Sequence, residues 1–322
     1  MDPATFFAAS RVVIVAGKGG VGKTTVTAAL ARAAARQGRR ALIVEVEGKS
    51  GLANMFGAED LGYDEITLAD ADEAAGTADI RARTLTSDEA MLEYLESHGM
   101  SRVAKRLVSS GAIDTLATAA PGIKDILVLG KVKALERADE GTFIVLDAPA
   151  AGHAITFLRA ARGLLDAVRV GPIHNQAVEV MELLTDADRC QVVLVTLPEE
   201  TPVNELVETA FNLEDQVGVA LGPVVVNGLY PARPGLDRDP ATAAAQAGVT
   251  LREGEAEALA AAADFRRHRV QLQTEQVGRL ADQLPLPQLR LPFLFGAELG
   301  PAEVDLLAAT LVDQLAALEG VA

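Results

Sequence analysis

One short segment near the start of the chain constrains the fold more than any other feature. Residues 17–25 read Gly-Lys-Gly-Gly-Val-Gly-Lys-Thr-Thr, directly after an apolar run at 11–16 and before an alanine-rich segment. This spacing fits G-x-x-x-x-G-K-[ST], the pattern of a phosphate-binding loop between a strand and a helix. Glycines let backbone N–H groups converge on phosphate oxygens, and the following helix N-terminus favours the same negative charge. A glycine-rich turn without a ligand is the alternative, but the complete pattern in this setting favours the phosphate site.

The loop predicts roles for individual residues. We expect Lys23 to reach the β- and γ-phosphates of a nucleotide, and the Thr24 hydroxyl to ligate Mg²⁺. The predicted nucleotide-binding residues of the loop are Gly17, Lys18, Gly19, Gly20, Val21, Gly22, Lys23, Thr24 and Thr25. The predicted cofactors are therefore ATP and Mg²⁺.

Lys18 is a second cation in the loop, at a position where an ordinary phosphate-binding loop makes no demand. A solvated surface lysine is the simpler explanation for one charge in an exposed loop. The segment, however, resembles the deviant Walker A motif, whose extra lysine reaches across a dimer interface to the nucleotide of the other subunit. This resemblance implies a dimer and gives Lys18 a catalytic role beside Lys23.

Short apolar runs alternate with helical patterns along the chain, which is typical of parallel βαβ units. Five strands are predicted, at residues 11–16, 41–46, 142–146, 191–196 and 223–226. Their Val/Ile/Leu content suits a sheet that is covered on both faces. The prediction is an α/β fold, a doubly wound and mostly parallel sheet in a single domain, 1–322, with functional loops at the carboxyl ends of the strands.

The interval between the second and third predicted strands is too long for one crossover and reads as helices. Thr86-Ser87-Asp88-Glu89 has the form of a capping box, and apolar residues follow it at helical spacing. We therefore predict an inserted helical subdomain at about 85–137. Its apolar residues either pack against one another and the sheet or line a groove for a hydrophobic client. With 5 methionines in the whole chain, an adaptable Met-rich surface is missing, which favours packing.

Asp147 ends the third predicted strand, where a phosphate-loop protein carries its outer-shell Mg²⁺ ligand. A polar strand end that begins a turn before Pro149 is the ordinary alternative. The predicted metal-binding residues are Thr24, directly, and Asp147, through water. His153 has no partner at metal-ligand spacing, and we interpret it as a hydrogen-bonded structural residue, although the pattern D-x-x-x-x-G-H from Asp147 to His153 also resembles a switch loop.

The charge balance disfavours some classes of partner. The chain carries 29 Lys+Arg against 45 Asp+Glu, a formal net charge of −16, which opposes a broad binding face for DNA or anionic lipid. No apolar run is long enough to span a bilayer, and the N-terminal residues lack the pattern of a signal peptide. We therefore expect a cytoplasmic protein with protein or small-molecule partners, no nucleic acid and no integral membrane segment.

Several separated segments together resemble the family of arsenite-pump ATPases and tail-anchored-protein targeting factors (ArsA-like). They are residues 17–25, 121–125, 147–153, 197–199, 226–227 and 291–294. The resemblance implies a dimer, with an identical chain or a paralogue, that ATP closes and hydrolysis reopens. It also implies a hydrophobic protein or membrane-associated client, and places Asn227, Pro292 and Phe293 beside adenine. From the sequence alone, Asn227 is a polar residue that ends a strand.

Two departures from the family pattern bear on mechanism. Glu47 stands where the family has the aspartate that orients the attacking water, and its extra methylene shifts the carboxylate by about 1 Å, enough to slow in-line attack. We therefore expect Glu47 to be catalytic and basal hydrolysis to be slow. The segment 44–49 also resembles an actinobacterial subgroup of the family. The single cysteine, Cys190, cannot build the zinc or metalloid sites of the family, so neither is expected.

Two other functions stay open from the sequence. A partition or cell-division positioning ATPase, acting on the nucleoid or membrane, shares the loop motif. The acidic charge balance disfavours it, as does a predicted C-terminal helix that has no Lys or Arg beside its apolar stripe. A nucleotide-sensing regulatory subunit with negligible turnover would carry the same loop without hydrolysis.

Overall fold

The computed structural model of the chain describes residues 3–46, 48, 51–97, 99–100, 102, 122–149, 151–296 and 298–318, with the side chains of 151–153 excepted. Three predictions therefore fall outside the described residues. They are the position of Glu47, the side chain of His153 and the middle of the predicted helical subdomain.

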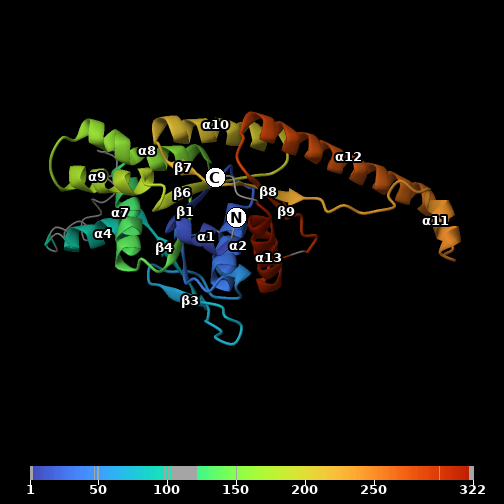
Figure 1. The fold of residues 1–322 in the computed structure, drawn as a ribbon, viewed down its shortest axis with the longest axis horizontal. Coiled ribbons are helices and arrows are strands. Elements are labelled where there is room, and N and C mark those ends of the chain that lie inside the picture. Colours follow the sequence, from blue (N-terminus) through green and yellow to red (C-terminus); the bar gives the residue numbers. More distant parts are fainter. Residues whose placement is uncertain are drawn as a thin grey trace.

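A single mixed sheet forms the centre of the described structure (Figure 1). Its strands are β1 (Val12–Ala16), β2 (Ala41–Val46), β3 (Ile66–Ala69), β4 (Ile80–Leu85), β5 (Phe143–Asp147), β6 (Cys190–Thr196), β7 (Ala220–Leu221), β8 (Val224–Leu229) and β9 (Gln288–Pro292). The strand order is β3-β4-β2-β5-β1-β6-β8-β9, with β7 paired to β6. Every pairing is parallel except that of β3 with β4. The prediction of a mostly parallel α/β sheet is confirmed.

The five predicted strands correspond to β1, β2, β5, β6 and β8, but the reading of the interval after β2 as helices alone was wrong. β4 lies in that interval and pairs in parallel with β2 along its whole length. Its sequence alternates Ile80, Ala82 and Thr84 with arginines, so it has no continuous apolar run. Arg81 and Arg83 instead pair with Glu65. A strand next to the sheet edge needs only one strongly apolar face, which is why a search for Val/Ile/Leu runs missed it.

Helices cover both faces of the sheet (Figure 1). One face carries α1 (Pro3–Ala9), α2 (Lys23–Arg36) and α13 (Pro301–Ala317); the other carries α7 (Ile123–Ala138), α8 (Ala151–Ala167), α9 (Pro172–Thr185) and α10 (Glu200–Gln216). Strand residues alternate between the two cores: Ile14 of β1 packs on the α7–α10 side, whereas Val13 and Val15 pack on the α2 side. The alanines of α2 are buried, which brings this helix close to the sheet and to α13.

The remaining helices are α3 (Leu52–Met55), α4 (Ser87–Ser97), α11 (Pro240–Gln246) and α12 (Glu255–Gln283). One half of the predicted capping box is present: the Glu89 amide donates to the Thr86 hydroxyl oxygen at 3.3 Å, and that hydroxyl donates to the Glu89 carboxylate at 2.6 Å. Met91 of α4 and Ile126 of α7 are buried in the same core as the sheet, so these described parts of the interval pack inward. The N-terminal half of α12 projects from the body with α11, and its buried residues begin only at Gln273 (Figure 1).

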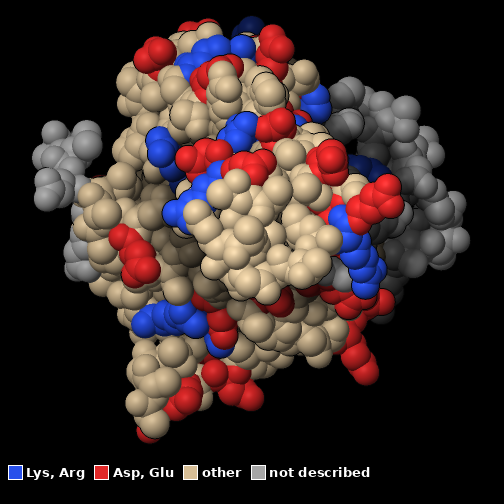
Figure 2. All heavy atoms as spheres, turned by 90° about the vertical axis from the view of Figure 1, so that its right-hand side faces the viewer, with Lys and Arg blue, Asp and Glu red and all other residues tan. Residues whose placement is uncertain are grey.

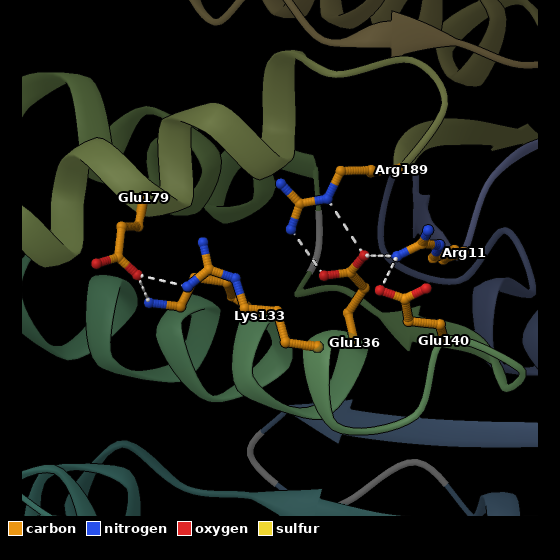
Figure 3. Close-up of polar contacts among 7 residues, drawn as sticks. Arg11, Lys133, Glu136, Glu140, Glu179 and Arg189 are labelled. Atoms are coloured by element: carbon orange, nitrogen blue, oxygen red, sulfur yellow. Dashed lines mark hydrogen bonds and ion pairs between the residues drawn. The ribbon is translucent and has the colours of Figure 1, made fainter.

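An ion-pair network fixes α7 to its neighbours (Figure 3). Glu136 of α7 is 1% exposed, and its two carboxylate oxygens accept from Arg11, at 3.0 Å, and from Arg189, at 2.7 Å. One turn earlier, Lys133 pairs with Glu179 of α9 at 2.6 Å. Because Arg11 precedes β1 and Arg189 precedes β6, the network joins the helix to the amino-terminal end of the central strands, opposite the functional loops.

We expect Glu136→Gln to lower the free energy of unfolding by about 1–3 kcal/mol at neutral pH, since hydrogen bonds to two charged groups are weakened. Burial pushes the pKa of Glu136 up, but the hydrogen bonds and charges of Arg189 and Arg11 outweigh it, so the pKa lies below its ordinary value. A depressed carboxylate pKa stabilises the fold above about pH 4.3, and the contribution is lost as pH falls through the folded-state pKa.

Urea denaturation of wild type and Glu136→Gln across pH measures this contribution. The difference between the two proteins should shrink as pH falls below about 4. Glu140→Gln is the matched control, because Glu140 also contacts Arg11 but its side chain is 70% exposed. Equal destabilisation by both substitutions would show that burial of Glu136 has no special importance.

Candidate functional site

The predicted phosphate-binding loop joins β1 to α2 at the carboxyl edge of the sheet. Two of its glycines are required because neighbouring atoms lie too close to leave room for a side chain. A Cβ on Gly17 would lie 2.3 Å from the Val195 carbonyl oxygen, and a Cβ on Gly22 would lie 2.2 Å from Nδ2 of Asn227. Gly22 also has φ +90° and forms the N-cap of α2. The first N–H groups of α2 have no partner within the helix, so they face the loop as donors for an anion.

Lys23 begins α2 and is half-buried, with its Nζ 3.4 Å from the Lys18 carbonyl oxygen. Burial lowers the pKa of Lys23, while the negative charge of Asp147 raises it. The ammonium group is thus partly removed from water without a close carboxylate hydrogen bond among the described residues. An anionic ligand at the loop would supply the charge partner that burial makes favourable.

The structure brings together the two predicted metal-binding residues. The Thr24 hydroxyl donates to Oδ2 of Asp147 at 2.7 Å. Asp147 is 6% exposed, and no described residue hydrogen-bonds to its Oδ1. Burial raises the pKa of Asp147 to about 6, opposed by the Thr24 hydrogen bond and the charge of Lys23 and assisted by the charge of Glu45. A buried carboxylate beside a hydroxyl offers the hard oxygen donors that Mg²⁺ prefers, so the residues present fit this ion.

Lys18 has a partner within its own chain. Its Nζ lies 2.5 Å from Oε1 of Glu205 on α10, with the two side chains 37% and 40% exposed. An ion pair at this exposure contributes about 0–1 kcal/mol, so the lysine can leave it at little cost. The sequence did not identify Glu205, because nothing near it in the chain links it to the loop.

The three residues predicted to border adenine lie together at the ends of β8 and β9. Asn227 donates from Nδ2 to the Val21 carbonyl oxygen at 2.9 Å, which ties β8 to the phosphate-binding loop. Pro292 pairs in register with Leu229, and the Phe293 amide donates to the Leu229 carbonyl oxygen at 2.7 Å. Asn227, Pro292 and Phe293 therefore form one wall at the ends of β8 and β9, in which Asn227 contacts the loop.

Two aromatic residues that the sequence analysis missed extend this wall. The ring centroids of Phe293 and Phe295 are 4.8 Å apart, and Tyr230 lies 5.3 Å from Phe293 and 5.4 Å from Phe295. The Arg266 guanidinium of α12 lies 5.2 Å from the rings of Tyr230 and Phe295. The alternating aromatic residues Phe293 and Phe295 were the sequence signal that could have indicated this cluster. The cluster connects the end of the sheet to the projecting helix α12.

Cys190 lies away from this site. It is the first residue of β6, at the opposite edge of the sheet, and it is fully buried. Burial raises the pKa of its thiol to about 12, so it stays protonated and packs as an apolar residue. Within the described ranges no three His, Cys, Asp or Glu residues come together as metal ligands, and no helix there has the length and apolarity to cross a membrane.

Comparisons with known proteins show the family to which the chain is similar. Residues 10–170, which contain β1, the loop, α2 and Asp147, match the family described as "Anion-transporting ATPase" (ArsA). The chain is 33% identical over 311 residues to "ATPase BagA" of Mycobacterium tuberculosis, covering 90% of this chain and 89% of that protein.

More distant relatives carry related names. The chain is 25% identical to "ATPase GET3B" of Arabidopsis thaliana, over 68% of this chain and 66% of that protein. It is 27% identical to "Arsenical pump-driving ATPase" of Escherichia coli, over 67% of this chain and 39% of that protein. With a matching family over half of its length and an ATPase relative aligned over nine-tenths of it, the chain belongs to the ArsA-like family of anion-transporting ATPases.

Proposed function

We propose that the chain is a Mg²⁺-dependent ATPase that works as a nucleotide-switched dimer. The observation that carries the proposal is the convergence at one sheet edge of a glycine-constrained loop, a half-buried Lys23 and the Thr24–Asp147 pair. Membership of an ATPase family supports hydrolysis as the activity.

Each described residue has a defined task in this proposal. The loop N–H groups and Lys23 bind the phosphates, and Lys23 neutralises charge on the transferred phosphoryl group. Thr24 and, through water, Asp147 would hold Mg²⁺, which would neutralise negative charge on the phosphates. Asn227 and the Pro292–Phe293 segment would border the base.

The dimer part of the proposal rests on Lys18. In one chain this residue contacts Glu205, and the exposed pair leaves it free to exchange partners at little cost. ATP would draw two loops together, with each Lys18 reaching the phosphates in the other chain. The mate is a second copy or a paralogue. A hydrophobic protein or membrane-associated client would respond to this closure, and residues 85–137 would form the helical subdomain that connects the two events.

A partition or positioning ATPase is the second candidate, and the charge distribution on the face with the projecting helix disfavours it. Figure 2 shows the face that carries the projecting helix, where basic side chains lie among acidic ones and do not form a continuous patch. The densest basic run, 266–269 on α12, is engaged internally: Arg267 contacts Asp264, and Arg269 pairs with Glu199. Sedimentation with DNA or anionic liposomes should therefore leave this protein in the supernatant, and cosedimentation with either would favour the second candidate.

Sedimentation velocity tests the dimer proposal. With Mg²⁺ and a non-hydrolysable ATP analogue, the sedimentation coefficient should rise to that of two chains, and with ADP it should fall. If the purified chain stays monomeric with the analogue bound, the experiment is repeated with the paralogue that copurifies from native extract. A monomer in both experiments would contradict the nucleotide-switched dimer.

The role proposed for Glu47 gives a prediction about rate. If its carboxylate orients the attacking water, Glu47→Gln should reduce single-turnover phosphate release about 10-fold or more while ATP affinity hardly changes. Glu47→Asp should keep or raise the rate, because the shorter side chain restores the reach of the usual aspartate. Turnover of Glu47→Gln at the wild-type rate would remove Glu47 from the mechanism and move the water-orienting role elsewhere in 45–50.

A further inference from the structure

A row of polar side chains crosses the carboxyl end of the sheet beside the phosphate-binding loop. Thr84 of β4 pairs in register with Glu45 of β2, and Glu45 pairs in register with Asp147 of β5. The residues two positions earlier, Ala82, Ile43 and Val145, belong to the core on the α2 face. Side chains two apart on a strand share a face, so the polar row also points toward the α2 side, where the loop lies.

Glu45 is a charged residue in an otherwise apolar, buried strand. It is 5% exposed, and its Oε2 accepts from the Thr84 hydroxyl at 2.9 Å. Gly48 passes over this pair with φ +56°, and a Cβ there would lie 2.8 Å from Cγ2 of Thr84 and 3.7 Å from Oε2 of Glu45. This places a second buried carboxylate on the strand next to Asp147, at the same level of the sheet.

Glu45 lies in register with the predicted metal ligand on the neighbouring strand. Asp147 has a buried Oδ1 that no described residue hydrogen-bonds, while its Oδ2 is occupied by Thr24. Of the influences on the pKa of Asp147, burial is the largest upward one, and the charge of Glu45 acts in the same direction. Two carboxylates on neighbouring strands therefore repel each other in a site of low polarity, and the phosphates of ATP would add further negative charge.

We propose that Glu45 is a positioning residue that acts through Asp147: its second negative charge makes nucleotide binding depend strongly on the divalent cation. Without the ion, Glu45 disfavours ATP by repulsion. When the divalent cation is bound, the charge of Glu45 strengthens the retention of the cation beside Asp147. This inference rests on the proposed Mg²⁺-ATP site and adds to it a residue that neither the loop motif nor the strand-terminal aspartate identifies.

Calorimetric titration with a non-hydrolysable ATP analogue, with Mg²⁺ and with EDTA, tests the proposal in the full-length chain. The quantity compared is the Mg²⁺ coupling, defined as the Kd in EDTA divided by the Kd in Mg²⁺. We expect Glu45→Gln to bind the analogue more tightly than wild type in EDTA, and to reduce the Mg²⁺ coupling about tenfold. A residue with a merely structural role would weaken binding under both conditions.

Two variants serve as controls. Thr84→Val removes the hydrogen bond to Glu45 but keeps the charge, and Glu45→Asp keeps the charge on a shorter side chain, so both should retain the wild-type coupling within about threefold. The proposal fails if Glu45→Gln has wild-type coupling, or if Thr84→Val changes the coupling as much as Glu45→Gln. If Glu45→Gln does not fold, loss of coupling in Glu45→Asp also overturns it. A wild-type chain that binds no analogue at all refutes the nucleotide site itself, which is a separate result.

Discussion

Lys23→Ala is expected to abolish measurable ATP binding, with a loss of affinity of about 100-fold to 10,000-fold. The substitution removes a cation that would make charge-assisted hydrogen bonds to two phosphates, each worth about 1.5–3 kcal/mol. It also leaves the first turn of α2 to bind the phosphates without the neutralising charge.

The fold should tolerate this change. Lys23 makes one long contact, 3.4 Å to the Lys18 carbonyl oxygen, and its pKa is already lowered by burial, so no strong internal interaction is lost. The melting temperature without nucleotide should stay within about 2 °C of wild type. Lys124→Ala on α7 is the matched control, because that lysine pairs with Asp88 of α4 and not with a residue of the loop. Wild-type ATP affinity in Lys23→Ala would refute the assignment of the loop.

Lys18→Ala is expected to bind ATP within about threefold of wild type but to lose turnover by about 100-fold or more, because a cation supplied from another chain acts mainly on the transition state. Mixing two inactive variants tests whether Lys18 acts on the nucleotide bound by the other chain or on the nucleotide bound by its own chain. In a mixture of Lys18→Ala with Lys23→Ala, each mixed dimer has one chain with an intact Lys23 that receives Lys18 from its mate.

An equal mixture should therefore recover about a quarter of the wild-type rate, since about half of the dimers are mixed and each has one restored site. Two inactive variants that stay inactive when mixed would contradict a role across the interface. Glu205→Gln is the control for the contact seen within one chain. If that contact only holds Lys18 before closure, this variant should keep or raise the turnover of wild type.

The strands at the centre of the sheet could be predicted from the sequence because almost all of their residues lie in the same apolar, buried environment. β1, β2, β5, β6 and the first half of β8 are buried on both faces, so they appear as apolar runs, interrupted in β2 by Glu45. β4 and β9 lie nearer the sheet edges and carry arginines on one side, at 81, 83 and 290. An alternating pattern of this kind over a few residues is easily taken for part of a helical stretch.

The candidate site was predictable where its residues are neighbours in sequence or end a strand. The loop positions and Asp147 meet that condition, and the structure brings them together. Glu45 and Glu205 do not meet it, because their importance comes from register across the sheet and from packing of α10 against the loop. Glu45 is nevertheless a charged residue within the apolar run 41–46, and this charge indicated that β2 has a polar neighbour beside Glu45.

Single-turnover phosphate release by the wild-type chain tests the central claim most directly. With ATP and Mg²⁺ we expect slow release of phosphate that stops in EDTA and is missing in Lys23→Ala. The contrary result is ATP that binds to wild type, does not bind to Lys23→Ala, and is recovered intact after long incubation with Mg²⁺. Such binding without hydrolysis would contradict the proposed ATPase activity. That result would make the protein a nucleotide sensor without turnover.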